Sequence, residues 1–354
     1  MRILHISRTM GQGGAEKIVY QLCMDNKEDY QVVISDGGQY VDKLAESGIK
    51  HYMMPDIDSK NPFNMLRAFY CIWRTTNREK IDILHSHHRM AAFYAKIISK
   101  FTNVKTVYTA HNVFNNKVAL THFSLSGTNI IAVGDGVKKN LIDFFKLDSE
   151  YISTIYNSIK ISLKGSGAPE LDALKKKGKF LVGSIGRITE QKGIDIFIKS
   201  IGQAVEVNND LVGIIIGDGE DRSKMELMVK AMNLEDNIVF LGYRDNVLDI
   251  IKQLDFVVLA SRWEGLPLTP IETFSQGKTV IASDIPGNNE VVADKKTGLL
   301  FEKDNINELA KRIILLSSNT KLLDRLQQSA YRIYLDKYNY DIFINSYKNI
   351  YKNI

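Results

Sequence analysis

Short apolar runs alternate with longer amphipathic segments from the start of the 354-residue chain onward. The longer segments have helical spacing, most clearly at Ala15–Asn26 and Met90–Lys100. The short runs of the first half are strand candidates: Ile3–Ser7, Gln31–Ser35, Ile81–His85, Lys105–Ala110, Asn129–Val133 and Ile152–Tyr156. Such alternation predicts βαβ units built around a parallel sheet.

A further helix is expected after Asn61-Pro62, a pair typical of a helix start. Its apolar residues recur at helical spacing: Leu66, Phe69, Tyr70 and Trp73. We expect the aromatic side chains of this segment to fill the core rather than to lie on the surface: Phe63, Phe69, Tyr70 and Trp73.

A break in the pattern follows the first half. Residues 161–178 hold glycines, a proline and a run of three lysines, and they predict a linker. The alternation then restarts with a second set of strand candidates: Phe180–Ile185, Leu211–Ile216, Ile238–Leu241, Phe256–Leu259, Thr279–Ala282 and Gly298–Phe301. We therefore predict an α/β protein with two domains, 1–160 and 179–338, and a C-terminal helix over 339–354 that can pack on either of them.

Composition narrows the class of protein. The hydrophobic share of 44% and the charged share of 25% are ordinary for a globular protein. No apolar run approaches a membrane span, no signal peptide is recognised, and Cys23 and Cys71 have no CxxC partner. These features favour a cytoplasmic protein and give no sign of a nucleic-acid partner.

The net charge of +5 is unevenly distributed. The stretch from Lys60 to Lys117 contains ten cationic residues and only two acidic ones, Glu79 and Asp82. This stretch suits an anionic membrane surface or a phosphorylated acceptor, and an ordinary solvated helix face explains it equally well.

The first motif that can carry chemistry is Gly11-Gln12-Gly13-Gly14-Ala15-Glu16, between a predicted strand and a predicted helix. Glycines let a ligand approach the backbone closely, and a helix N-terminus favours an anion. The spacing is not that of the dinucleotide fingerprint, and a tight turn without a ligand is the alternative.

The second motif is Gly186-Arg187-Ile188-Thr189-Glu190-Gln191-Lys192-Gly193, which follows the strand Phe180–Ile185. Two cations at the carboxyl end of a strand, next to a helix start, suit a diphosphate. The Arg187 guanidinium can fork onto phosphate oxygens while Lys192 supplies a point charge.

The third motif, Glu264-Gly265-Leu266-Pro267-Leu268-Thr269-Pro270-Ile271-Glu272, follows the strand Phe256–Leu259. Its prolines fit the first turn of a helix, whose free N–H groups can hold a phosphate. The two carboxylates, Glu264 and Glu272, can accept hydrogen bonds from sugar and ribose hydroxyls. Two solvated glutamates are the plainer alternative.

Histidines follow two strands of the first half. His85, His87 and His88 are spaced like metal ligands, but no nearby carboxylate or cysteine completes a shell. We expect His87 and His88 to line an acceptor site and predict no metal site. Asp56-Ile57-Asp58 matches the Asp-x-Asp of metal-dependent sugar transfer, and we interpret it as a chance match in a polar loop.

The three motifs in this order resemble glycosyltransferase family 4, a family of retaining enzymes with the GT-B fold. The similarity continues through Ile216-Gly217-Asp218-Gly219-Glu220, Phe240-Leu241-Gly242-Tyr243, Ala282-Ser283-Asp284-Ile285-Pro286-Gly287 and Gly298-Leu299-Leu300-Phe301. The resemblance implies two Rossmann-like domains that face each other across a cleft. It also implies transfer of a sugar, of the hexosyl type, from a nucleotide diphosphate donor, with UDP favoured.

The resemblance assigns roles to the matched positions. The residues it implies for catalysis are Glu264, His111, Arg187 and Lys192. Those it implies for donor binding are Gly13, Gly14, Gly186, Arg187, Lys192, Tyr243, Arg244, Glu264, Gly265, Leu266, Leu268, Thr269 and Glu272. With Glu16, His87 and His88 we expect an acceptor site for a glycan or lipid-linked sugar of cell-surface polysaccharide assembly, such as capsule or exopolysaccharide, at the inner face of the membrane.

The sequence departs from the family pattern at Asn157-Ser158, where Asn-Gly is usual, and at Thr269-Pro270, where an aliphatic residue is usual. No metal or other cofactor is expected, because the cations and helix N–H groups can neutralise the leaving group. A nucleotide-sugar epimerase or a phosphorylase on the same fold, and a non-catalytic nucleotide-sugar-binding subunit, are the alternatives.

Overall fold

The computed structural model describes residues 1–11, 13–163 and 165–354. Gln12 of the first glycine-rich motif and Lys164 of the predicted linker lie outside the described residues. The chain forms two compact units. Unit 1 comprises Met1–Ser158 and Tyr340–Ile354, and unit 2 comprises Ile159–Asn339.

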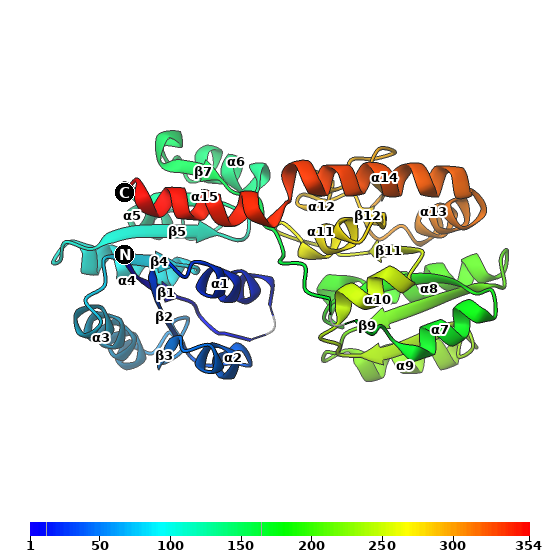
Figure 1. Ribbon diagram of the computed structural model, residues 1–354, viewed down its shortest axis with the longest axis horizontal. Coiled ribbons are helices and arrows are strands. Elements are labelled where there is room, and N and C mark those ends of the chain that lie inside the picture. The colour runs from blue at the N-terminus through cyan, green and yellow to red at the C-terminus, as the bar shows by residue number, and fades with distance from the viewer. Residues whose placement is uncertain (12, 164) are drawn as a thin grey trace. The chain divides into compact units, whose positions relative to one another are not determined.

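Unit 1 is built on a parallel sheet with the strand order β3-β2-β1-β4-β5-β6-β7 among its described residues (Figure 1). The strands are β1 (Arg2–Ile6), β2 (Tyr30–Ser35), β3 (Lys50–Met53), β4 (Ile83–Ser86), β5 (Lys105–Ala110), β6 (Asn129–Ala132) and β7 (Ile152–Thr154). All but β3 coincide with predicted strands. The pattern missed β3 because this edge strand has four residues, of which none is fully buried.

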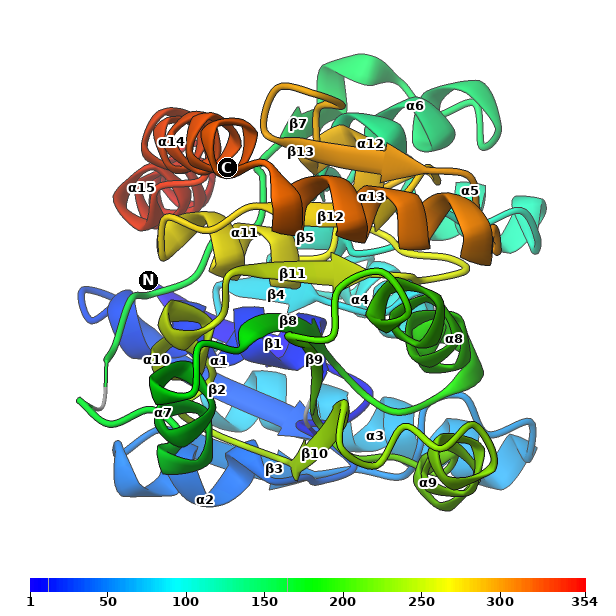
Figure 2. The same ribbon diagram turned by 90° about the vertical axis from the view of Figure 1, so that its right-hand side faces the viewer.

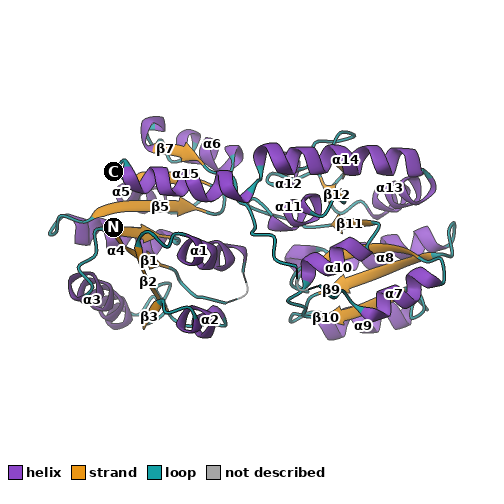
Figure 3. Ribbon diagram, viewed as in Figure 1, coloured by secondary structure: helices purple, strands orange, loops and turns teal. Residues whose placement is uncertain are grey.

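Helices cover both faces of this sheet (Figure 3). They are α1 (Gly14–Asp25), α2 (Tyr40–Glu46), α3 (Pro62–Arg78), α4 (Arg89–Ser99), α5 (Val118–Leu125), α6 (Asp135–Asp143) and α15 (Tyr340–Lys352). The C-terminal helix α15 belongs to unit 1 and buries Phe343, Ile344, Tyr347 and Tyr351. Its tyrosine hydroxyls reach Asp25, Thr109 and His85 of the same unit.

The helix α3 starts where Asn61-Pro62 predicts it, and the Asn61 side chain accepts a hydrogen bond from the Phe63 N–H. Its apolar residues, however, do not all fill the core. Leu66 is 68% exposed, and Phe63 and Tyr70 are exposed as well. The buried face consists of Ala68, Ile72, Thr75 and Thr76, while Phe69 and Trp73 are half-buried at its edge. The helix packs on the sheet mainly through small side chains. The larger side chains of Phe63, Leu66 and Tyr70 lie on the opposite face of the helix and are exposed.

Unit 2 is also built on a parallel sheet, with the order β10-β9-β8-β11-β12-β13 (Figure 2). The strands are β8 (Phe180–Ile185), β9 (Leu211–Ile216), β10 (Ile238–Gly242), β11 (Phe256–Leu259), β12 (Val280–Ser283) and β13 (Gly298–Phe301). Its helices are α7 (Pro169–Lys176), α8 (Ile194–Val205), α9 (Arg222–Ala231), α10 (Val247–Gln253), α11 (Leu268–Ser275), α12 (Asn288–Val291), α13 (Ile306–Ser318) and α14 (Thr320–Lys337). These strands match the predicted ones closely because all but β10, which is about half-buried, are buried or nearly buried apolar runs.

The predicted linker 161–178 contains the helix α7. Pro169 occupies the first turn, acidic residues follow it, and lysines close the last turn, an arrangement that favours a helix. Leu171 is fully buried, and the Ala168 N–H donates to the side chain of Gln253 on α10. The prediction overlooked this helix because one apolar anchor gives too weak a periodic signal.

In each sheet, strands are added first on one side of the first strand and then on its other side. In unit 1 the chain moves outward from β1 through β2 to β3 and then returns to pair β4 with β1. In unit 2 β11 pairs with β8 in the same way. Ligands of doubly wound sheets bind at the carboxyl ends of the strands at such a switch point. The loops after β8 and β11 therefore mark a candidate site in unit 2, and those after β1 and β4 mark one in unit 1.

Candidate functional site

The second and third motifs are the two loops at the switch point of unit 2. The loop after β8 ends at Gly193, whose φ of +63° is left-handed. A Cβ atom at this position would lie 2.1 Å from the carbonyl oxygen of Ala260, at the end of β11. Only glycine permits this contact, so Gly193 brings the Arg187–Lys192 loop against the loop that carries Glu264.

Lys192 and Glu264 meet across these loops. The Lys192 Nζ donates to Glu264 Oε1 at 2.5 Å, and the Ser261 hydroxyl donates to the same oxygen at 2.7 Å. The Glu264 side chain is only 8% exposed, so the ammonium and the hydroxyl compensate a nearly buried carboxylate. The second oxygen, Oε2, has no hydrogen bond or ion pair to any described residue. Glu264 is thus held through one oxygen only.

A second contact holds the Glu264 loop from the other side. A Cβ atom at Gly287 would lie 2.0 Å from the Gly265 carbonyl oxygen. The Ser283 hydroxyl donates to the Ser261 carbonyl, and the Asn288 amide donates in turn to Ser283. Ser261 and Asn288 were not among the predicted site residues. A small polar residue two positions after a buried strand was the only signal that could have found Ser261.

Arg187 is the exposed cation of this site. No hydrogen bond or ion pair joins its guanidinium to another residue in the described ranges. Arg262, on the neighbouring loop, is by contrast fully used: it pairs with Asp195 at 2.8 Å and with Asp304 at 3.0 Å. The hydrogen bond to Asp195 raises the pKa of Arg262 further. Arg187 therefore differs from Arg262 in that no described residue supplies its countercharge.

The helix α11 presents its N-terminus beside Glu264. Pro267 is the N-cap residue and supplies no side-chain hydrogen bond to the first turn. The N–H groups of Leu268 and Thr269 are consequently not capped by a side chain, as an anion site requires. Glu272 lies one turn further along the same helix, and its side chain is buried. Leu266 packs beneath the loop with 6% of its surface exposed.

Tyr243 and Arg244 follow β10, at some distance in sequence from the two loops. Tyr243 is 52% exposed. Arg244 donates to the Leu241 carbonyl and pairs with Glu170 of α7 at 3.0 Å. A contact of Arg244 with a nucleotide donor would therefore compete with this ion pair.

In unit 1 the first glycine-rich motif opens the helix α1. Gly13 is its N-cap residue, in extended conformation, and Gly14 is its first residue. The Glu16 carboxylate folds back onto this turn, and a Cβ atom at Gly13 would lie 2.1 Å from Glu16 Oε2. An acidic side chain thus faces the N-terminus of α1, where negative charge is favoured.

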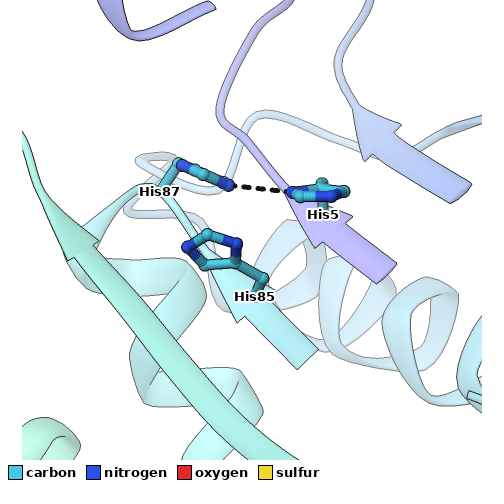
Figure 4. A group of neighbouring side chains, drawn as sticks. All are labelled: His5, His85 and His87. Atoms are coloured by element: carbon cyan, nitrogen blue, oxygen red, sulfur yellow. Dashed lines mark hydrogen bonds between the residues drawn. The ribbon is translucent and has the colours of Figure 1, made fainter. Parts of the chain in front are cut away.

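Histidines gather at the switch point of unit 1. His5 on β1, His85 on β4 and His87 just after β4 are buried together, and Figure 4 shows their rings side by side. His5 was not among the predicted site residues, since its strand is distant along the chain from the other histidines. His87, expected to line an acceptor site, is instead buried, and its two ring nitrogens contact His5 and His111. It lies beneath His111 rather than on the surface.

The three histidines are the one group of metal-ligand type among the described residues, with ligand atoms within 4.8 Å of one another. Each of their ring nitrogens already has a partner within the chain. His85 contacts the hydroxyls of Tyr351 at 2.7 Å and Thr109 at 2.8 Å. A metal ion would have to displace these hydrogen bonds.

A hollow of about 200 Å³ lies at the start of α4 in unit 1. His88 lines it, and His88 also caps α4 and lies 3.4 Å from Asp58. Asp58 and Asp56, the residues of the Asp-x-Asp match, both pair with Arg8. Two further cations line the hollow, Arg89, whose guanidinium lies 3.8 Å above the Phe114 ring, and Lys117.

Comparison with known proteins follows the same division of the chain. The model named Glycosyltransferase Family 4 matches residues 12–163, and the model named Glycosyl transferases group 1 matches residues 171–333.

Two curated relatives align over 99% of this chain. UDP-Gal:alpha-D-GlcNAc-diphosphoundecaprenol alpha-1,3-galactosyltransferase from Escherichia coli is 23% identical, with 96% of its length covered. Poly(ribitol-phosphate) alpha-N-acetylglucosaminyltransferase from Staphylococcus aureus strain COL is 28% identical, with 64% of its length covered.

Among solved structures, HepE from Anabaena in complex with UDP-glucose superposes with a TM-score of 0.87 at 19% identity, over the full length of both chains. This likeness shows the GT-B fold. This protein therefore carries a Glycosyltransferase Family 4 domain over residues 12–163 and a Glycosyl transferases group 1 domain over residues 171–333, and it belongs among the glycosyltransferases.

Proposed function

We propose that this protein is a retaining glycosyltransferase that moves a sugar from a UDP-linked donor to a lipid-linked or glycan acceptor. The observation that carries the proposal is the Lys192–Glu264 pair at the switch point of unit 2, beside an exposed Arg187 and the uncapped N-terminus of α11. Cations and N–H groups suit the diphosphate, while the carboxylates suit the hydroxyls of the sugar and ribose. The E. coli relative and the HepE complex both carry UDP-sugars in their names, which supports UDP as the nucleotide.

The proposed roles follow the geometry. Arg187 and Lys192 bind the diphosphate and stabilise the charge that develops on it as the bond from the sugar to the phosphate oxygen breaks. Glu264 positions the sugar through Oε2, and Glu272 holds the ribose. The acceptor hydroxyl forms the new bond on the same face, and its proton passes to the departing phosphate. We propose that no metal is needed, because the two cations and the N–H groups of α11 neutralise the leaving group.

For the acceptor side, we propose that the hollow in unit 1 receives an anionic group. Arg89 and Lys117 line it, as does Asp58. The planar Arg89 guanidinium suits a phosphate oxygen pair, for which it would release its hydrogen bonds to Asn116 and Thr121. The relatives act on acceptors named as a diphosphoundecaprenol-linked sugar and a poly(ribitol-phosphate), both of which carry phosphate. Glu16 and His88 remain proposed acceptor contacts.

The direct test offers purified protein a panel of nucleotide sugars, with the nucleoside diphosphate released measured with and without lipid-diphosphate-linked sugar acceptors. We expect release to require an acceptor and to be greatest with a UDP-sugar. Consumption of UDP-N-acetylglucosamine without acceptor, followed by NMR, would instead identify an epimerase. Tight UDP binding by calorimetry without transfer to any acceptor would identify a binding subunit. The configuration of the new linkage, read by NMR, tests retention.

We also propose that unit 1 rests on an anionic membrane through the outer face of α3, defined here as Phe63, Leu66, Arg67, Tyr70 and Arg74. The three apolar residues are all more than half exposed. The helix has arginines and no acidic residue, so its charge complements an anionic lipid surface. None of the helices in the described ranges has the length and apolar character needed to cross a bilayer.

Vesicle flotation tests this surface. The protein should float with vesicles that contain anionic phosphatidylglycerol at low salt, and less with neutral phosphatidylcholine. The double variant Leu66→Ser with Tyr70→Ser should bind about tenfold more weakly, because two apolar side chains no longer enter the lipid. Phe101→Ser serves as the control, since Phe101 is 73% exposed but lies outside α3. Equal flotation of the double variant, or none by the original protein, would contradict the proposal.

A further inference from the structure

Four side chains form a continuous line of hydrogen bonds in unit 1, here called the histidine chain: Gln31, His5, His87 and His111. Gln31 Oε1 lies 2.8 Å from His5 Nε2, His5 Nδ1 lies 3.1 Å from His87 Nε2, and His87 Nδ1 lies 3.2 Å from His111 Nε2. The residues come from β2, from β1, and from the ends of β4 and β5, which are neighbours in the sheet. The histidine chain therefore crosses the sheet, with His111 as its last member.

The Gln31 amide fixes the direction of these hydrogen bonds. Its Nε2 group faces the carbonyl oxygen of Asn26 at 3.4 Å, so its Oε1 faces His5. A flipped amide would place its oxygen against that carbonyl oxygen, two acceptors without a proton between them. His5 must then donate from Nε2, which leaves its Nδ1 bare in the neutral ring.

The tautomer of His5 determines the tautomers of the two histidines that follow it in the histidine chain. A bare Nδ1 on His5 needs a donor, so His87 carries its proton on Nε2 and has a bare Nδ1 in turn. The same requirement places the proton of His111 on Nε2. The argument holds while the rings are neutral, and burial lowers the pKa of His5 and of His111 to about 4. Burial, then the nearby His85 and other histidines, lowers the pKa of His87 well below its ordinary value.

We propose that His5 and His87 are positioning residues that hold His111 in its Nε2–H tautomer, with Nδ1 left as a hydrogen-bond acceptor. His111 Nδ1 has no partner among the residues that the structure describes. It is then set to accept a hydrogen bond from a hydroxyl group, the one kind of donor that a sugar offers in quantity. The identity of that sugar rests on the proposed function, whereas the tautomer itself does not.

His85 is adjacent to the histidine chain but is not part of it. Its ring centroid lies 4.0 Å from that of His87, yet its nitrogens contact Tyr351 and Thr109 instead. Figure 4 shows the His5–His87 contact as a dashed line, with His85 beside it. His85 therefore offers a matched control with the same surroundings and without a place in the line of hydrogen bonds.

Nitrogen-15 NMR of histidine-labelled protein at pH 7 tests the proposal on the unmodified chain. Long-range proton–nitrogen spectra distinguish a protonated ring nitrogen from a bare one. We expect His5, His87 and His111 to show Nε2–H and a bare Nδ1, with His111 assigned by its absence from His111→Gln. An Nδ1–H tautomer or a charged ring at His111 would overturn the proposal. A loss of the His5 and His87 signals on addition of Zn²⁺ would overturn it in favour of a metal site.

The variant Gln31→Met removes the acceptor that orients the histidine chain while preserving side-chain length. We expect the His111 signals to shift toward an average of both tautomers, whereas His85→Gln should leave them in place. An unchanged His111 spectrum in Gln31→Met would overturn the proposal. Sugar transfer by Gln31→Met should fall about fivefold in kcat/KM, the effect of one neutral hydrogen bond. A protein with the expected spectra that transfers no sugar would overturn the proposed function and leave the tautomer assignment standing.

Discussion

The loops after β8 and β11 in unit 2 and the histidine chain in unit 1 occupy equivalent places in two doubly wound sheets. They use opposite electrostatics. In unit 2, Lys192 and Glu264 carry full charges that compensate each other, and Arg187 remains exposed. In unit 1, burial keeps the imidazole rings of His5 and His111 neutral. In unit 2 paired charges thus lie beside an exposed cation. In unit 1 the histidine chain offers oriented hydrogen bonds without charge, while Arg89 and Lys117 line the separate hollow at the start of α4.

The difference follows from how each region is solvated. A side chain with little solvent exposure stays charged only when opposite charges or hydrogen bonds compensate it. In unit 2 these partners come from loops that are far apart in sequence. Imidazole loses its proton when buried, so packed histidines need no countercharge. The comparison teaches that the same place in the same fold can hold paired charges in one unit and neutral hydrogen-bonded rings in the other; our proposals assign a diphosphate to the first and a hydroxyl to the second.

The largest expected effect concerns the charged region, defined here as the loops after β8 and β11 that carry Arg187, Lys192 and Glu264. Arg187→Ala should lower kcat/KM for sugar transfer by about 10²–10³-fold, because a donor to the developing negative charge is lost. Glu264→Gln should cause a loss of similar size. The amide oxygen can replace Oε1, but the NH2 group at the position of Oε2 cannot accept a hydrogen bond from a sugar hydroxyl, and Lys192 loses its countercharge. Steady-state kinetics with the best donor measures both.

Two variants calibrate this result. Arg332→Ala removes an exposed arginine of α14 and should leave activity unchanged. Ser261→Ala removes the hydroxyl that donates to Glu264 and should cost about fivefold. Full activity of Arg187→Ala or of Glu264→Gln would contradict a role of the charged region in the reaction.

A smaller effect concerns the histidine chain, whose contribution to the free energy of unfolding should depend on pH. The folded-state pKa of His5 is lowered to about 4, so the unfolded chain binds more protons between pH 6.5 and 4. The free energy of unfolding should therefore decrease as pH falls through this window, by up to about 3 kcal/mol for His5 alone. Urea denaturation at pH 7, 6 and 5 measures the loss.

The contribution of the charged region to the free energy of unfolding should be lost at lower pH than that of the histidine chain. Burial opposes ionisation of Asp195, but the hydrogen bonds from Arg262 outweigh it and lower its pKa, so its contribution is lost only at more acidic pH. His5→Gln should reduce the pH dependence between 7 and 5, and His122→Gln, which alters an exposed ring on α5, should not. A pH dependence unchanged by His5→Gln would contradict the neutral histidine chain.

Much of this architecture was predictable because parallel strands are buried apolar runs. Phe180–Ile185, Leu211–Ile216 and Phe256–Leu259 were predicted to the residue. The exposed edge strand β3 and the helix α7, with little apolar character of their own, were not. The family was predictable as well, since its motifs are local and their order survives in the sequence.

By itself the sequence determined the two α/β units, the family and the loops that follow β8 and β11. Tertiary structure alone decided which side chains meet. Lys192 reaches Glu264 because Gly193 permits a close backbone contact, and His5 reaches His87 because β1 pairs with β4. Periodicity reports whether a residue is buried, whereas a hydrogen bond depends on which strands become neighbours.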